Sequence, residues 1–135
     1  MSKTRLVMLN YAGDYREAYQ RLTSGGKETY YAQKYSVDTL AGMTDHYDEV
    51  IVIVCMTEDR YDEVLPNGVR AIGLGQHSGR VARTAIEALR AVQPRHLIIS
   101  FLMPSIILWA LLQKFRISVM FSNSYLTPQR LRSRF

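Results

Sequence analysis

Short apolar stretches alternate along the chain with longer segments whose apolar residues recur at helical spacing. The first stretch, residues 5–12, predicts a buried strand. Residues 49–56 are almost continuously apolar and β-branched, which predicts a second strand that is covered on both faces. Shorter stretches predict three further strands at residues 69–74, 97–101 and 117–121.

The segments between these strands predict helices. Residues 15–22 form either a short helix or part of a long loop, and the polar glycine turn at residues 24–28 is expected to open a helix over residues 27–44. Residues 80–92 have clear helical spacing, with charged side chains on the outer face. Residues 104–115 predict a last helix, because Pro104 suits a first turn.

Strands that alternate with helices of this length need crossover connections and therefore form a parallel sheet. The expected fold class is α/β: a doubly wound, Rossmann-like three-layer α/β/α sandwich, with about five strands in the order 3-2-1-4-5. We expect residues 1–126 to form this domain. Residues 127–135 contain Arg130, Arg132 and Arg134 and are interpreted as a basic tail or the truncated start of a further helix.

The carboxyl ends of parallel strands meet at one edge of the sheet, and ligands of open α/β sheets bind there. The segments that follow the predicted strands should therefore lie close together. They are residues 10–13, 56–59, 76–79, 101–105 and 122–125. His77 falls at this edge, whereas His46 and His96 precede strands and fall at the opposite one.

The composition narrows the range of partners. The net charge of +5 favours anionic partners, but no nucleic-acid motif is present, so no nucleic-acid partner is expected. Cys55 is the only cysteine, which excludes a disulfide framework, and no metal-ligand spacing is found. The chain shows no signal-peptide pattern, and residues 102–112 are too few to span a membrane. We therefore expect a cytoplasmic protein and leave association with a membrane surface open.

Two glycine motifs are candidates for ligand binding. Residues 73–79 look like a dinucleotide fingerprint because they follow a strand and open a helix. However, the third glycine comes one residue late, the strand is not the first, and no acidic residue ends the next strand. A tight turn is the alternative, and binding of a nucleotide cofactor is kept as a third functional hypothesis. Gly25-Gly26 beside Lys27 could approach a phosphate or a sugar closely, without the spacing of a P-loop.

The order of these parts resembles the amino-terminal, acceptor-side domain of GT-B fold glycosyltransferases of the retaining glycosyl transferase group 1 / family 4 class. The resemblance runs from residue 5 to about residue 125. It rests on the first strand with Gly25-Gly26 and the helix after it, and on the entry to the second strand at residues 48–52. It continues with the helix end, proline and strand of residues 86–99 and with the strand at residues 117–121.

The resemblance implies that the chain is the acceptor-binding half of an enzyme that transfers a sugar from a nucleotide-sugar donor. A second, donor-binding domain or subunit that this chain lacks would complete the enzyme, so the chain alone is expected to be inactive. It would hold no cofactor itself, and the full enzyme would use the nucleotide sugar. Catalytic residues are not identified. The residues expected near the acceptor and donor cleft are Asn10, Gly25, Gly26, Lys27, His77, Phe101 and Asn123.

The alternative function is a stand-alone α/β ligand-binding or partner module without catalysis. Residues 102–112 are apolar nearly all round, so one side of this helix should be buried by something. The missing domain, or a second copy in a homodimer, could cover it. Phe101 could contribute to an apolar acceptor site or to the core.

Overall fold

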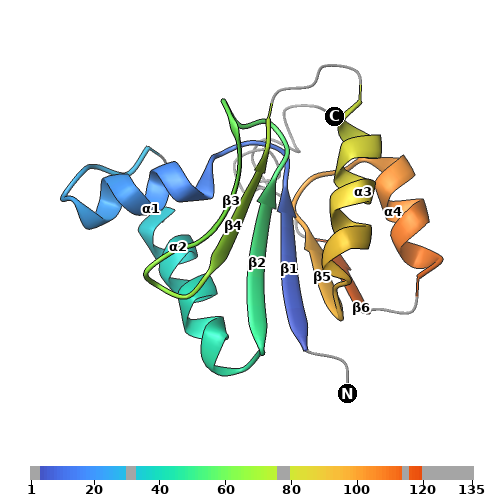
Figure 1. Ribbon diagram of the computed structural model, residues 1–135, viewed down its shortest axis with the longest axis horizontal. Helices are drawn as coiled ribbons and strands as arrows, with labels where there is room; N and C mark the ends of the chain where they lie inside the picture. The colour runs from blue at the N-terminus through green and yellow to red at the C-terminus, as the bar shows by residue number, and fades with distance from the viewer. Residues whose placement is uncertain (1–3, 30–32, 76–79, 114–115, 120–135) are drawn as a thin grey trace, which may run out of the picture.

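The structure is a computed structural model of the chain and describes residues 4–29, 33–75, 80–113 and 116–119 (Figure 1). These residues form one sheet with helices on both of its faces. The strands are β1 (Arg5–Asn10), β2 (Glu49–Val54), β3 (Arg60–Val64), β4 (Arg70–Leu74), β5 (His96–Ile99) and β6 (Arg116–Val119). The helices are α1 (Tyr15–Thr23), α2 (Gln33–Gly42), α3 (Val81–Val92) and α4 (Pro104–Leu111), and a 3₁₀ turn, η1 (Met43–Asp45), follows α2.

The sheet is mostly parallel. β1 lies in the middle and pairs in parallel with β2 on one side and β5 on the other. β2 pairs in parallel with β4, and β5 with β6, whereas β3 runs antiparallel to β4. The predicted α/β class is therefore confirmed. The order of the described strands is β3-β4-β2-β1-β5-β6, which differs from the predicted order by the additional antiparallel strand at one edge.

The sequence pattern does not predict β3, because four of its five residues are exposed and three of those carry charges. Charged side chains of this kind are common on edge strands, where they discourage pairing with another chain. Arg70 of β4 donates to both carboxylate oxygens of Asp62 at 2.8 Å, which lowers the pKa of Asp62 and fastens the two strands. A turn at residues 66–68 joins them, with Gly68 at a positive φ of 89°.

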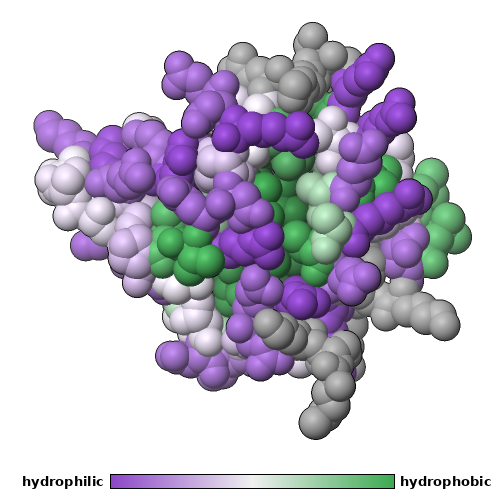
Figure 2. Space-filling model, viewed as in Figure 1, coloured by the Kyte–Doolittle hydropathy of each residue, from purple (hydrophilic) through white to green (hydrophobic). Residues whose placement is uncertain are grey.

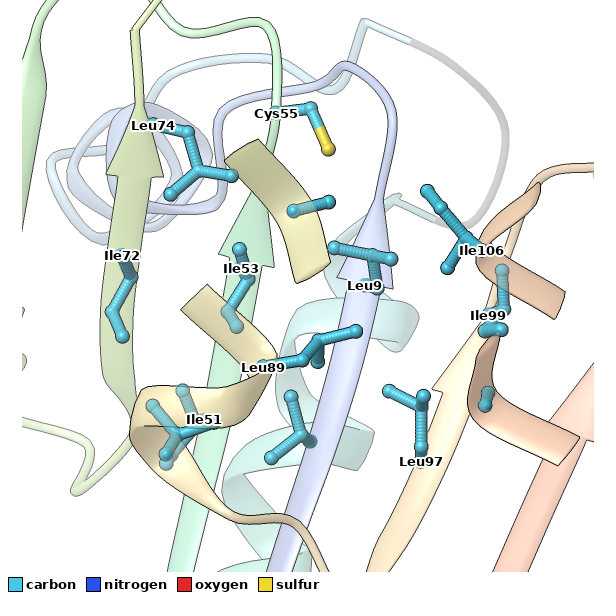
Figure 3. Close-up of a cluster of buried hydrophobic side chains, with 14 residues drawn as sticks. Leu9, Ile51, Ile53, Cys55, Ile72, Leu74, Leu89, Leu97, Ile99 and Ile106 are labelled. Atoms are coloured by element: carbon cyan, nitrogen blue, oxygen red, sulfur yellow. The ribbon is translucent and has the colours of Figure 1, made fainter. Parts of the chain in front are cut away.

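Alternate residues of the central strands point to opposite faces of the sheet, and each face has its own core. On one face, Leu9 and Ile53 pack with Leu89 of α3 and Ile106 of α4 (Figure 3). The other face packs against α1 and α2. Its buried residues include Leu6, Val50, Val52 and Val54 from β1 and β2, Ala18 from α1, and Val37 and Leu40 from α2.

The first two helices correct the sequence analysis. Of the two alternatives for residues 15–22, the helix is the one observed, and Asp14 caps it by accepting from the backbone N–H groups of Arg16 and Glu17. The helix predicted for residues 27–44 is shorter, since α2 spans only Gln33–Gly42. Gly25, with a φ of 88°, ends α1 instead of opening α2, because this backbone conformation is typical of the residue after a helix.

The later helices follow their predicted patterns. α3 covers Val81–Val92 and buries Ala85, Leu89 and Val92, while Arg83, Glu87 and Arg90 are exposed as expected. Pro104 stands in the first turn of α4 as predicted, but the helix spans only Pro104–Leu111 and so ends before the predicted residue 115. Within the described part of the chain, no helix has the length and apolar character needed to cross a membrane.

Candidate ligand site at the carboxyl edge of the sheet

The carboxyl ends of β1 and β5 form the point where the chain diverges to opposite faces of the sheet. The two strands are paired neighbours. The chain leaving β1 enters α1 and α2, whereas the chain leaving β5 enters α4, which packs on the other face (Figure 1). Ligands of open α/β sheets bind outside the strand ends at such a switch point.

Asn10 and Ser100 form a hydrogen-bonded pair at this point. The Ser100 hydroxyl donates to Asn10 Oδ1 at 2.6 Å and lies 3.1 Å from the carbonyl oxygen of Leu9. The backbone N–H of Ser100 also donates to the Leu9 carbonyl, at 3.0 Å. Because Oδ1 accepts from Ser100, the orientation of the Asn10 amide is fixed, and its nitrogen presents two N–H donors on the other side of the group.

An aromatic pair lies next to this amide. The ring centroids of Tyr11 and Phe101 are 5.6 Å apart, with 59° between the ring planes. Phe101 is half-buried and packs against the core that α3 and α4 cover, while Tyr11 is 43% exposed. The carboxyl edge thus combines an amide donor of fixed orientation with an accessible aromatic surface.

A second polar group fastens the start of α1 to β3. The hydroxyl of Tyr61 donates to the carboxylate of Asp14, the cap of α1. The Arg16 guanidinium lies 3.7 Å from the centroid of the Tyr61 ring and is 3.3 Å from Asp59 and 3.6 Å from Glu63. Burial and the hydrogen bond to Asp14 raise the pKa of Tyr61, so the phenol stays a donor at neutral pH. We interpret this group as structural and call it the clasp. It comprises Asp14, Arg16, Asp59, Tyr61 and Glu63.

No sequence pattern predicts the clasp. Residues 10–13 and 56–59 are predicted to lie close together, but the contact of Asp14 with Tyr61 is not, because Tyr61 lies in the unpredicted strand β3. Thr57 is buried, donates to the Asp59 carbonyl at 2.8 Å and accepts from the N–H of Gly75 at 2.9 Å. These bonds fix the loop after β2 against the end of β4.

The clasp also accounts for the first glycine of the motif at residues 73–79. A Cβ atom on Gly73 would lie 2.3 Å from the Tyr61 ring and 2.7 Å from Thr57 Oγ1, so a larger residue does not fit. Gly75 has a positive φ of 78°, as a turn requires. Residues 76–79, including His77, lie outside the described residues. Nucleotide-cofactor binding by this motif therefore stays a prediction.

The structure brings together only part of the predicted site. Asn10 and Phe101 lie at the switch point, whereas Gly25, Gly26 and Lys27 follow the far end of α1, at the left of Figure 1. The nine residues of α1 make it about 14 Å long, which separates this turn from the sheet edge. Asn123 lies outside the described residues.

Local packing explains the glycine turn after α1. A Cβ atom on Gly26 would lie 2.5 Å from the Arg21 side chain and 2.7 Å from its carbonyl oxygen. The Arg21 guanidinium donates to the carbonyl oxygen of Lys27, so the turn folds back on the end of its own helix. Ligand binding by Gly25, Gly26 and Lys27 stays a prediction.

Other reactive side chains do not add to the site. Cys55 is 3% exposed, and burial raises the pKa of its thiol to about 12. The His96 ring lies 3.5 Å from the Tyr47 hydroxyl at the amino-terminal edge of the sheet. In the described ranges, no three or more His, Cys, Asp or Glu side chains form a group that could hold a metal ion.

Scans against protein families, curated proteins and solved structures found no match for this chain. The candidate site therefore rests on the fold and on the side chains at the carboxyl edge.

Replacing Gly73 by alanine should destabilise the protein by about 1–3 kcal/mol, because the added methyl group overlaps the Tyr61 ring and Thr57. The control is Gly42→Ala in α2, where a Cβ atom meets nothing within 4 Å. That change should be neutral or stabilise by about 0.5–1 kcal/mol. Urea unfolding followed by circular dichroism measures both, and equal effects would contradict the close packing at Gly73.

The thiol of Cys55 should react with Ellman's reagent at pH 8 at least about 100-fold more slowly in the folded protein than in urea, because it is buried and protonated. The folded thiol keeps its proton up to a pKa of about 12, whereas the unfolded thiol ionises near 9.0. The stabilisation that the protonated Cys55 thiol adds to the free energy of unfolding should therefore have its full value below pH 9.0 and decline as the pH rises towards 12. Fast labelling of the folded protein would show that Cys55 is accessible.

Proposed function

We propose that this chain is the acceptor-binding half of a glycosyltransferase and that the acceptor binds between the carboxyl ends of β1 and β5. The observation that carries the proposal is the fixed amide of Asn10 beside the aromatic pair of Tyr11 and Phe101. A sugar ring has apolar C–H faces and a rim of hydroxyl groups. The exposed Tyr11 ring suits such a face, and the Asn10 amide suits a hydroxyl oxygen.

The fold supports the same class. A doubly wound, three-layer arrangement is part of this proposal, and the two cores on opposite faces of the sheet support it. A central first strand with the chain diverging beside it also agrees with the GT-B resemblance. The wider acceptor site would include the segments that follow β4 and β6.

Transfer of the sugar would require a second domain or subunit that binds the nucleotide-sugar donor. The leaving diphosphate of such a donor needs positive groups or N–H donors that stabilise its charge. Arg16 is at the carboxyl edge, but Asp59 and Glu63 already bind its guanidinium. The donor half would therefore supply this stabilisation, and the chain alone would bind an acceptor without transferring sugar to it.

A glycan array tests this proposal directly, with the full chain as the probe. We expect binding to a subset of glycans, and Asn10→Ala or Tyr11→Ala should weaken it about 10-fold, the effect of losing one good hydrogen bond or one aromatic contact. Tyr35→Ala is the control, because Tyr35 is a tyrosine on α2 that is 74% exposed and is not part of the candidate site. Glycan binding that neither edge variant weakens would contradict the site.

A ligand-binding module without catalysis is the second candidate, favoured by the fact that the Asn10 and Tyr11 surface is formed by this chain without a donor domain. The two candidate functions differ in whether the native protein includes a donor-binding domain or subunit. A donor-binding domain on the native polypeptide, or a donor-binding subunit that co-purifies with it, supports the transferase. Glycan binding with neither of them supports the module.

A further inference from the structure

The outer side of α4 is apolar and exposed. Leu108 and Leu111 in α4 are 63% and 64% exposed, and Leu112, directly after it, is 83% exposed. Ile106 and Ala110, at 0% exposure, face the sheet. Successive residues of a helix are about 100° apart, which places Leu108 and Leu112 roughly opposite Ile106 and Ala110, and Leu111 between that side and the flank of Ile107. This apolar surface is therefore directed away from the sheet.

The neighbouring helix α3 presents a basic surface on the same outer side. Arg83, Glu87 and Arg90 lie opposite the buried Ala85 and Leu89, and Arg80 precedes the helix. Figure 2 shows hydrophilic side chains over α3 and hydrophobic atoms beside them, at the right edge over α4. The guanidinium of Arg90 lies 5.9 Å from the centroid of the Trp109 ring and connects the two helices. We call this surface the leucine–arginine face. It comprises Leu108, Leu111, Leu112, Arg80, Arg83 and Arg90.

The direction of the leucines argues against their burial by a further strand and helix of the same sheet. A further strand beside β6 would bring its helix alongside α4, at the flank where Ile107 lies, since helices in such a layer lie side by side on the sheet. Such a helix would not cover Leu108 or Leu112, which point away from the sheet. A partner that buries Leu108 and Leu112 would therefore lie on the outer surface of α3 and α4.

The charge of the leucine–arginine face distinguishes between a second copy of the chain and an anionic surface as its partner. Arg80, Arg83 and Arg90 stand against one acidic residue, Glu87, which pairs with Arg83 at 3.4 Å, and α4 carries no charge. If two copies met through their leucines, the arginines of both would be brought together and would repel each other. An anionic surface with an apolar interior complements both parts of the face.

We propose that the leucine–arginine face binds the surface of an anionic membrane. The leucines would enter the boundary between headgroups and acyl chains, and the arginines would bind lipid phosphates. Together the two helices offer the apolar and the basic part that single amphipathic helices combine when they bind a membrane surface. The inference does not depend on the proposed glycosyltransferase function, because the leucine–arginine face does not include Asn10, Tyr11 or Phe101.

Sedimentation with lipid vesicles tests the proposal. The full chain should sediment with phosphatidylcholine vesicles that contain about one-quarter phosphatidylglycerol, and high salt should weaken this binding. Arg83→Gln with Arg90→Gln should weaken it about 25-fold at low salt, at about fivefold for each arginine near a charged surface. Leu108→Gln with Leu111→Gln should weaken it at least about 10-fold, because the apolar contact is lost.

Tyr35→Gln on α2 is the matched control, since it also removes an exposed large apolar side chain, on the helix that packs against the opposite face of the sheet. Its vesicle binding should equal that of the parent chain, and circular dichroism should show that all variants are folded. Absence of binding, equal binding to pure phosphatidylcholine, or unchanged binding of the leucine variant would overturn the proposal. So would a lipid-free dimer, detected by light scattering, that the leucine variant dissociates.

Discussion

The parallel pairing of β1 with both β2 and β5 organises the two cores and the carboxyl edge of the sheet. It places Val7 and Leu9, both at 0% exposure, between two strands and beneath a helical layer. The chain after β1 continues on one face and the chain after β5 on the other, so this pairing also creates the divergence at Asn10 and Ser100. The same interaction that buries the core therefore forms the candidate site.

The carboxyl edge is held by contacts that belong to the fold. Ser100 bonds to the Leu9 carbonyl and to the Asn10 amide, so the end of β5 fixes the end of β1. On the other side of β1, Asp14 caps α1 and accepts a hydrogen bond from the hydroxyl of Tyr61 in β3. A ligand would meet side chains whose positions are set before it binds, which reduces the entropy lost on binding.

Sequence patterns predict elements whose burial is regular, and they fail where tertiary contacts decide. The apolar runs of β1 and β2 and the spacing of α3 identify these elements directly. The strand β3 escapes because its charged residues face solvent and only Tyr61 packs inward. Gly25 and Gly26 look like a ligand loop, but they end α1, and the contact that requires Gly26 is with Arg21. At the site, the positions of Asn10 and Phe101 could be predicted, because both lie at the ends of predicted strands. The hydrogen bond between Ser100 and Asn10 could not, because it joins residues that are far apart in the sequence.

Backbone amide chemical shifts would locate a ligand bound between the carboxyl ends of β1 and β5. A ¹⁵N-labelled chain titrated with a glycan that it binds should show shift changes at residues 10–13 and 100–103, with Gly25, Gly26 and Lys27 unchanged. That result would place the ligand between β1 and β5. Changes confined to Gly25–Lys27, with none at Asn10 or Ser100, would contradict a site between β1 and β5 and would place the ligand at the turn after α1.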